Sequence, residues 1–185
     1  MPRMKITLGE TKATKNWFAR HAEAEAKKDA MPYSERVGNV VAVVAIILVT
    51  LYFVAHQMWS TGFFTSKFGS VEMFLFYASL LYGLVPTGVR SLVGGKNLAR
   101  LFDVFGSVLI TITLVWLYVV FPFDFSHFAD VLPTFVRFLL QWISNDIARV
   151  LMVIGIIVAP IMMVYTAVLY VFVRKELSKP SLKPT

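Results

Sequence analysis

The chain has 185 residues, of which 57% are hydrophobic and 16% are charged, with a net charge of +7. Soluble domains carry about one quarter charged residues, so this composition excludes an ordinary soluble domain. The chain contains no cysteine, which excludes disulfides, thiolate metal sites and cysteine nucleophiles. The positive charge is concentrated in two tails and one short loop, without interleaved aromatic residues. It therefore indicates contact with anionic lipid headgroups rather than with nucleic acid.

Residues 1–36 form a polar and basic N-terminal tail. Within it, residues 13–30 are rich in alanine and contain Glu23 and Lys27 at the i,i+4 spacing that favours a short helix. Trp17 is a candidate anchor at the membrane interface. The pattern predicts a short amphipathic helix that lies on the membrane or docks on a partner, and the alternative is a solvated, partly frayed tail.

Four later blocks have the length that an α-helix needs to cross the hydrocarbon core, which is about 20 mostly apolar residues. They cover residues 37–55, 71–89, 101–122 and 150–173. Polar residues do not recur in them every three or four positions, as they would in the amphipathic helices of a soluble core. The sequence therefore predicts an all-α fold, an integral membrane four-helix bundle formed by residues 37–173.

Lysine and arginine are distributed unevenly around these spans. Fifteen of the 18 lie in the N-terminal tail, in the loop from Arg90 to Arg100 and in the basic C-terminal tail, residues 174–185. Only three lie in the other two loops. The positive-inside rule then predicts that both termini are cytoplasmic, with the chain in the inner membrane if the cell is prokaryotic.

Residues 132–144 lie outside the spans and show a narrow polar stripe on a broad apolar surface. This pattern favours an amphipathic helix that lies in the outer headgroup region, although a continuation of the fourth span is also compatible with it. Asp146 and Arg149 are expected to form an ion pair, because they are three residues apart on a helix. Trp59 and Trp142 are expected to anchor the chain at the outer interface.

Small residues recur at four-residue steps on three of the predicted spans, and such faces let membrane helices approach closely. They are Gly38, Ala42, Ser79, Gly83, Thr87, Ser107 and Thr111. These faces either pack the four helices into one monomer or pack against another chain. In the fourth span, Pro160 cannot donate a backbone hydrogen bond and Gly155 adds flexibility, so a kink is expected there.

One cluster of potential metal ligands lies in the third loop, namely Asp124, His127 and Asp130. These side chains are weak candidates for a divalent-cation site. The alternative is an outer loop whose phenylalanines dip into lipid while its carboxylates meet water. Arg100 and Asp103 lie three residues apart near the start of the third span and are expected to pair near the interface. No catalytic or cofactor site is predicted.

These observations favour a non-enzymatic tetraspan protein that works through protein contacts, as a subunit, assembly factor or scaffold of a membrane complex. Its expected partners are membrane lipids and other membrane chains, or further copies of itself. A homo-oligomeric channel or carrier is the first alternative. The second is an enzyme that acts on lipids at the outer face through Asp124, His127 and Asp130.

Overall fold

A computed structural model describes residues 17–179, and the predicted tails lie outside the described residues before position 17 and after position 179. The described part is all-helical and contains no strand. Its elements follow in the order α1 (Trp17–Lys27), α2 (Tyr33–Met58), α3 (Ser70–Tyr82), α4 (Leu84–Leu92), α5 (Lys96–Val120), η1 (Phe125–His127), η2 (Thr134–Leu139) and α6 (Asn145–Leu177). The elements η1 and η2 are 3₁₀ helices.

Four helices in the described part are long and apolar enough to cross a membrane, as predicted. They are α2, the α3–α4 pair (Ser70–Leu92), α5 and α6. The shortest of them has 23 residues, and a helix of that length rises about 35 Å, which exceeds a hydrocarbon core of about 30 Å.

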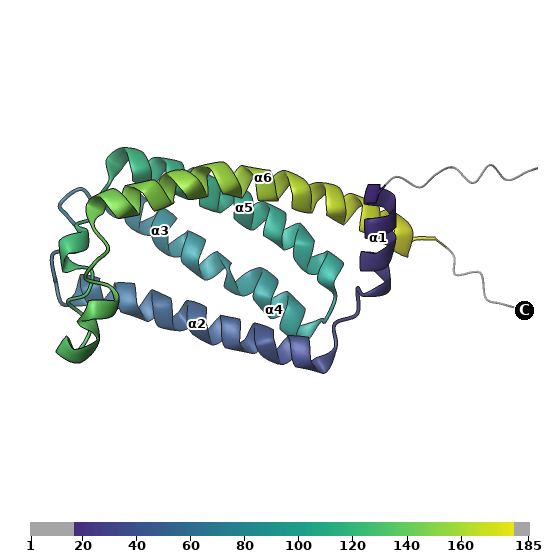
Figure 1. Ribbon diagram of the computed structural model, residues 1–185, viewed down its shortest axis with the longest axis horizontal. Coiled ribbons are helices and arrows are strands. Elements are labelled where there is room, and N and C mark those ends of the chain that lie inside the picture. The colour runs from purple at the N-terminus through teal and green to yellow at the C-terminus, as the bar shows by residue number, and fades with distance from the viewer. Residues whose placement is uncertain (1–16, 180–185) are drawn as a thin grey trace, which may run out of the picture.

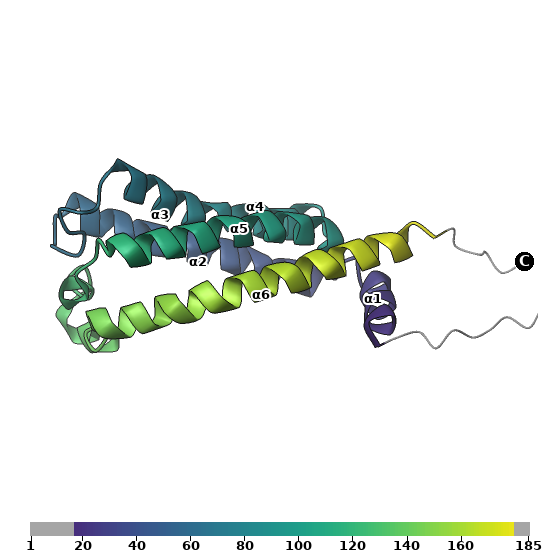
Figure 2. The ribbon, with the colours of Figure 1, turned by 90° about the horizontal axis from the view of Figure 1, so that it is seen from above.

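The four spans form an open, curved layer (Figures 1 and 2). Helix α2 packs on α4 and α3, both of these pack on α5, and α5 packs on α6. Along their described lengths, α2 and α6 do not pack on each other. We call the face between α2 and α6 the open side. The expected four-helix bundle, closed around one axis, is therefore not confirmed, although its four helices are present.

The two ends of the layer are built differently. Helix α1 and the end of α6 lie at one end, together with the turn between α4 and α5, and we call this the tail end (Figure 1). The connections from α2 to α3 and from α5 to α6 lie at the opposite end, which we call the loop end. Both described ends of the chain thus lie at the tail end of the layer. The cytoplasmic placement of the tail end stays a prediction.

The second span is broken at Gly83, which separates α3 from α4. Pro86 explains the break, because it has no N–H to donate to the carbonyl of Tyr82 four residues earlier. The kink expected in the last span, near Gly155 and Pro160, stays a prediction. Helix α6 is assigned as one α-helix through Pro160. A Cβ on Gly155 would lie 2.8 Å from Leu114 Cδ1 on α5, so this glycine permits close helix packing.

The segment at 132–144 is not a regular α-helix. It forms η2 and then turns, and α6 begins afresh at Asn145. The Ser144 side chain accepts a hydrogen bond from the Ile147 N–H and caps the new helix. The compatible alternative, a continuous extension of the fourth span, is therefore wrong. The amphipathic in-plane helix is not confirmed either, because the only regular secondary structure in this segment is the short 3₁₀ helix η2.

The predicted small residues serve different roles. The hydroxyls of Thr87, Ser107 and Thr111 donate to carbonyls four residues earlier on their own helices, and Ser79 donates to a carbonyl three residues earlier. Gly83 does allow close approach, because a Cβ there would lie 3.2 Å from Ile46 Cδ1 on α2. Gly38 is exposed, and a Cβ there would meet nothing within 4 Å. Ala42 is half-buried on the same helix.

Candidate functional site

An aromatic core lies beneath the loop end. Phe63 and Phe123 are 1% and 7% exposed and lie 5.4 Å apart, centroid to centroid. Further phenylalanines pack around them from α2, α3 and both loops: Phe53, Phe64, Phe68, Phe76, Phe125 and Phe128. The expectation that the phenylalanines of the third loop dip into lipid is therefore wrong for Phe123. Their aromatic surface is removed from lipid and water by packing on one another.

Backbone hydrogen bonds join the two loops above this core. The Asp124 N–H donates to the Phe63 carbonyl over 2.7 Å, and the Thr65 N–H donates to the Pro122 carbonyl over 3.0 Å. Phe64 and Phe123 form the corresponding bridge. The two loops are therefore fixed to each other by both their backbones and their rings.

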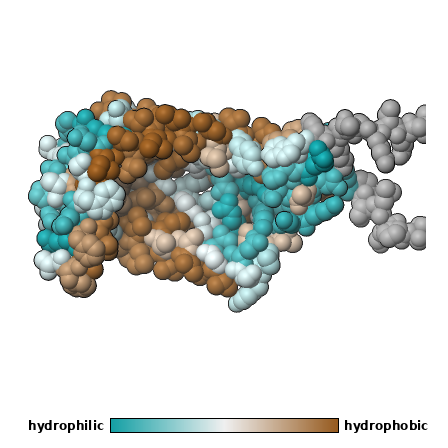
Figure 3. All heavy atoms as spheres, viewed as in Figure 1, coloured by the Kyte–Doolittle hydropathy of each residue, from teal (hydrophilic) through white to brown (hydrophobic). Residues whose placement is uncertain are grey.

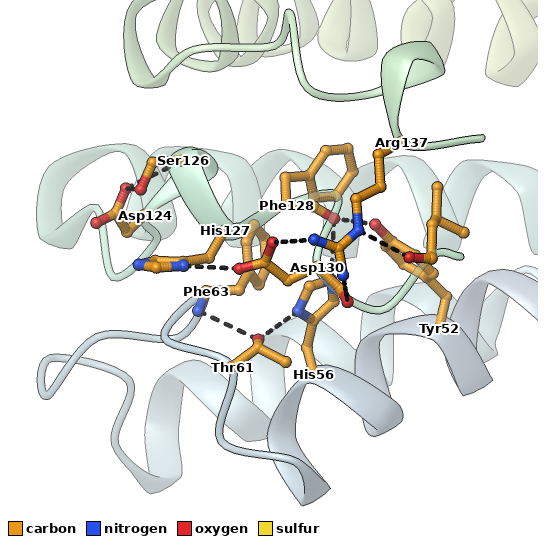
Figure 4. Close-up of polar contacts among 11 residues, drawn as sticks. Tyr52, His56, Thr61, Phe63, Asp124, Ser126, His127, Phe128, Asp130 and Arg137 are labelled. Atoms are coloured by element: carbon orange, nitrogen blue, oxygen red, sulfur yellow. Dashed lines mark hydrogen bonds and ion pairs between the residues drawn. The ribbon is translucent and has the colours of Figure 1, made fainter. Parts of the chain in front are cut away.

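A buried histidine fastens the third loop to α2 (Figure 4). His56 is 1% exposed, with Nδ1 2.6 Å from Thr61 Oγ1 and Nε2 3.1 Å from the carbonyl oxygen of Phe128. A carbonyl only accepts, so Nε2 carries the proton and Nδ1 accepts from the Thr61 hydroxyl. Tyr52, one turn earlier, donates to the same carbonyl. A neutral imidazole satisfies this whole arrangement.

The polar contacts continue away from α2 along the loop (Figure 4). His127 Nδ1 lies 2.8 Å from Asp130 Oδ2, and Arg137 Nη1 lies 3.5 Å from Asp130 Oδ1. Arg137 also donates to the carbonyls of Leu132 (2.9 Å) and Asp130 (3.0 Å). Gly62 lies against His127, and its φ of +95° favours glycine. Arg137 thus holds the loop in a closed turn.

The three candidate metal ligands are not gathered into one group in the described residues. Asp124 Oδ1 accepts from the Ser126 N–H (3.0 Å) and from its hydroxyl (2.7 Å), while His127 and Asp130 bond to each other. Among residues 17–179, no group of three or more histidine, aspartate or glutamate side chains is arranged to hold a metal ion. The hydroxyl and amide of Ser126 lower the pKa of the Asp124 carboxyl.

The tail end is held by a docked helix. Helix α1 lies across the end of α6, where Ala22 is fully buried against Leu169 and Val173. Phe18 packs edge-on against Phe172 at 5.2 Å. The predicted short helix is therefore present in residues 17–27 and is docked within the chain, so the solvated-tail alternative does not describe this segment.

One ion pair joins this docked helix to α5, and two further pairs join other helices. Arg100 pairs with Glu25 of α1, Asp103 pairs with Arg90 of α4, and Lys96 Nζ lies 2.6 Å from Glu35 Oε2. The expected Arg100–Asp103 pair is therefore replaced by two pairs that cross between elements. Local spacing favoured the i,i+3 partner, but tertiary packing supplied other acids and bases to both residues.

The last expected ion pair is not present in the described residues, where no side-chain N···O distance within 4.0 Å joins Asp146 to Arg149. Arg149 instead lies over the Phe121 ring, 4.2 Å from its centroid. Phe121 ends α5 in a left-handed conformation. The cation thus covers the exposed face of the residue that turns the chain out of the third span.

The hydrophilic surface of the open side lies toward the tail end (Figure 3). Asp103 falls on the same face of α5 as Ile110, Leu114 and Leu117, because these positions are 7, 11 and 14 residues further along. The last three line an apolar cavity among the spans. The open side is therefore polar near Asp103 and apolar toward the loop end.

The three predicted interface anchors are all exposed. Trp17, Trp59 and Trp142 are 67%, 65% and 61% exposed, which is compatible with contact with headgroups but does not test it. The sequence analysis did not identify Trp116 as a structural residue. Its Nε1 donates to the buried Glu72 over 2.9 Å. Glu72 also accepts from the Gly69 N–H and so caps α3.

Sequence reasoning also missed the structural roles of His56 and Arg137. His56 follows the apolar part of α2 and Arg137 interrupts an apolar run, and a polar residue in such a place signals a required hydrogen bond. The partners are carbonyls 72 positions away from His56, and five and seven away from Arg137.

Comparison of the chain with protein-family models, with curated proteins and with solved structures finds no match.

Proposed function

We propose that this chain is a non-enzymatic membrane protein that works through protein contacts, as a subunit, assembly factor or scaffold of a membrane complex. The observation that supports this proposal is the open side. The Arg90–Asp103 pair on it is partly exposed, with 28% and 24% of the two side chains accessible. Charged groups at membrane depth are normally covered by protein or lie in a water-filled cavity.

The depth of this pair strengthens the argument. Asp103 lies seven residues after the first residue of α5, which places it about 10 Å along the helix axis. Helix α5 exceeds the hydrocarbon thickness by only a few residues, so Asp103 falls inside the hydrocarbon edge in a centred span. A partner segment that enters from the tail end and carries a hydrogen-bonding side chain satisfies the exposed part of the pair.

The first test is the composition of the native assembly. The chain is extracted from its own membrane under mild conditions, and the mass and components of the intact particle are measured. We expect a heterogeneous complex of fixed composition. A lone monomer without any co-purifying chain contradicts the proposal, and a symmetric homo-oligomer favours the channel or carrier alternative instead.

A second test locates the contact. A photo-crosslinking residue is placed at Ser107, one turn from Asp103 on the open side, and at Phe105, which is 59% exposed on the same helix. We expect the crosslinker at 107 to capture one partner chain, and the crosslinker at 105 to capture lipid. Equal capture of protein from both positions contradicts the assignment of the open side as the contact surface.

A further inference from the structure

The loop-end half of the open side contains an apolar cavity of about 190 Å³ that is partly open at the surface. Each of the four spans contributes to its wall, through Phe53 of α2, Ser79 of α3, Ile110 of α5 and Met152 of α6. Phe63 and Phe123 of the aromatic core close its loop end. An apolar cavity of about 150 Å³ is already large enough to stay dry and to bind an apolar molecule as large as benzene.

A second apolar hollow, of about 330 Å³, lies beside this cavity and is open at the surface. It runs along Leu48, Val49 and Tyr52 of α2 and is bounded by Leu132 and Leu140 of the loop end. Phe53 lines both hollows, which are therefore adjacent. The residues that line this groove include none from α6, so that helix does not form part of its wall.

The cationic side chain of Arg137 bonds to a residue of the groove. Arg137 donates through Nε to the carbonyl of Leu132, a groove residue, and its side chain is 38% exposed. Its contact with the Asp130 carboxylate is long, at 3.5 Å. The guanidinium has five donors, so it keeps donors for an external anion while it holds the loop. A phosphate is the anion that this planar donor set fits best.

We propose that the groove and the cavity bind one acyl chain of a membrane phospholipid, with the lipid phosphate against Arg137. Three features select this occupant. The two hollows are apolar, they are lined mostly by aliphatic and aromatic side chains, and the partly exposed Arg137 bonds to the groove residue Leu132. A phospholipid is the one molecule of the surroundings that carries both an apolar chain and an anion. Because Phe53 lines both hollows, the acyl chain passes over its ring from the groove into the cavity.

The test uses the full chain in vesicles of phosphatidylcholine and phosphatidylglycerol that contain a phospholipid with a diazirine at the middle of one acyl chain. After illumination, the labelled residues are mapped by mass spectrometry. We expect labels on cavity residues such as Ile110 and Met152. Labels spread evenly over exposed positions such as Phe74 and Phe105 mean ordinary annular lipid and overturn the proposal.

Two variants fill the cavity from different helices, I110F from α5 and S79F from α3. We expect each to lose the cavity labels, while I112F, an exposed position on the same helix as Ile110, keeps them. Helical content and elution volume identify a variant that has not folded, and the second filling variant then decides. Cavity labels that persist in a folded filling variant overturn the proposal.

The headgroup contact has its own readout. R137Q is labelled with an anionic phospholipid probe and with an uncharged diacylglycerol probe that carries the same diazirine chain. We expect weaker cavity labelling by the phospholipid and unchanged labelling by diacylglycerol. Equal loss with both probes means that Arg137 only shapes the loop, and it overturns the phosphate contact. Capture of a protein chain in the groove would assign this half of the open side to a partner instead.

Discussion

The two ends of the layer are stabilised by different forces. The loop end is held by rings in van der Waals contact and by backbone hydrogen bonds between the two loops. The tail end is held by ion pairs that join α1, α4 and α5 and by the docking of α1 on α6. Aromatic packing is insensitive to salt, whereas partly exposed ion pairs are screened by it. The two ends should therefore respond differently to salt, pH and substitution.

This difference shows where the arrangement of the four spans is decided. Apolar helices gain little from apolar contact with one another in lipid, which is itself as apolar as leucine. The polar and aromatic contacts that fix helix neighbours lie mainly at the ends, and close packing at Gly83 and Gly155 adds to them along the spans. At the ends, buried rings, histidine–carbonyl bonds and charge pairs have only one satisfactory arrangement. The open side, which is the face between α2 and α6, is left uncovered.

The largest effect is expected from F63A, because Phe63 lies at the centre of the loop-end aromatic core. Loss of a buried phenylalanine side chain costs about 3–5 kcal/mol in the free energy of unfolding. Unfolding in mixed micelles, followed by tryptophan fluorescence, measures this cost. F74A is the matched control, since Phe74 is 69% exposed, and it should change the free energy little. Similar losses in both variants would contradict the aromatic core.

An intermediate effect is expected from E25Q, which leaves Arg100 buried without its acid. Arg100 Nη1 already lacks a partner among the described residues. The side chains are only partly shielded, so we expect a cost of about 1–3 kcal/mol, below the range for fully buried pairs. Helix α1 should then detach from α6, and trypsin should cleave faster after the exposed Lys27 and Lys28.

The salt dependence and a second variant sharpen this prediction. In the wild type, high salt should accelerate the same cleavage, while E25Q should respond to salt less. D103N should leave α1 docked, because Arg100 keeps Glu25. If D103N releases α1 as fully as E25Q does, then the local Arg100–Asp103 pair predicted from the sequence contributes to holding α1 on α6.

The smallest effect concerns the pH response of the loop end. Hydrogen bonds from Ser126 lower the pKa of Asp124 below its ordinary value of 3.8. A lowered carboxyl pKa means that the stabilisation is present above pH 3.8 and is lost as pH falls through the lowered pKa. S126A should therefore raise the pKa of Asp124, which carbon NMR of the labelled carboxyl measures. An unchanged titration in S126A would show that the hydroxyl does not bond to Asp124.

Some parts of the fold could be predicted because their causes are local. Long apolar blocks must satisfy their backbone groups internally, so four helices follow from composition and length alone. The tight turn at Gly94 likewise follows from its residue type, and its φ of +70° is one that glycine favours. The break at Gly83 could also have been predicted, because Pro86 cannot donate a backbone hydrogen bond to Tyr82.

The candidate site depended on contacts between distant residues. Nothing in the spacing of His56 indicates that it meets the Phe128 carbonyl, and nothing near Arg100 indicates Glu25. For Asp124, His127 and Asp130, proximity in sequence suggested a shared ligand, but each carboxylate found a better partner in the folded loop. Hydrogen-bond geometry selects among several nearby donors, and the sequence does not contain that geometry.

The sequence by itself determined that this is an all-helical chain with four apolar helices of membrane length, because hydrophobic length and backbone satisfaction leave no other regular structure. Only the tertiary structure decided which helices are neighbours, that α1 docks on α6, and that one side of the layer stays open. Those outcomes rest on a few buried rings and charge pairs at the two ends. Their energies depend on partners far apart in sequence and therefore appear only once the chain is folded.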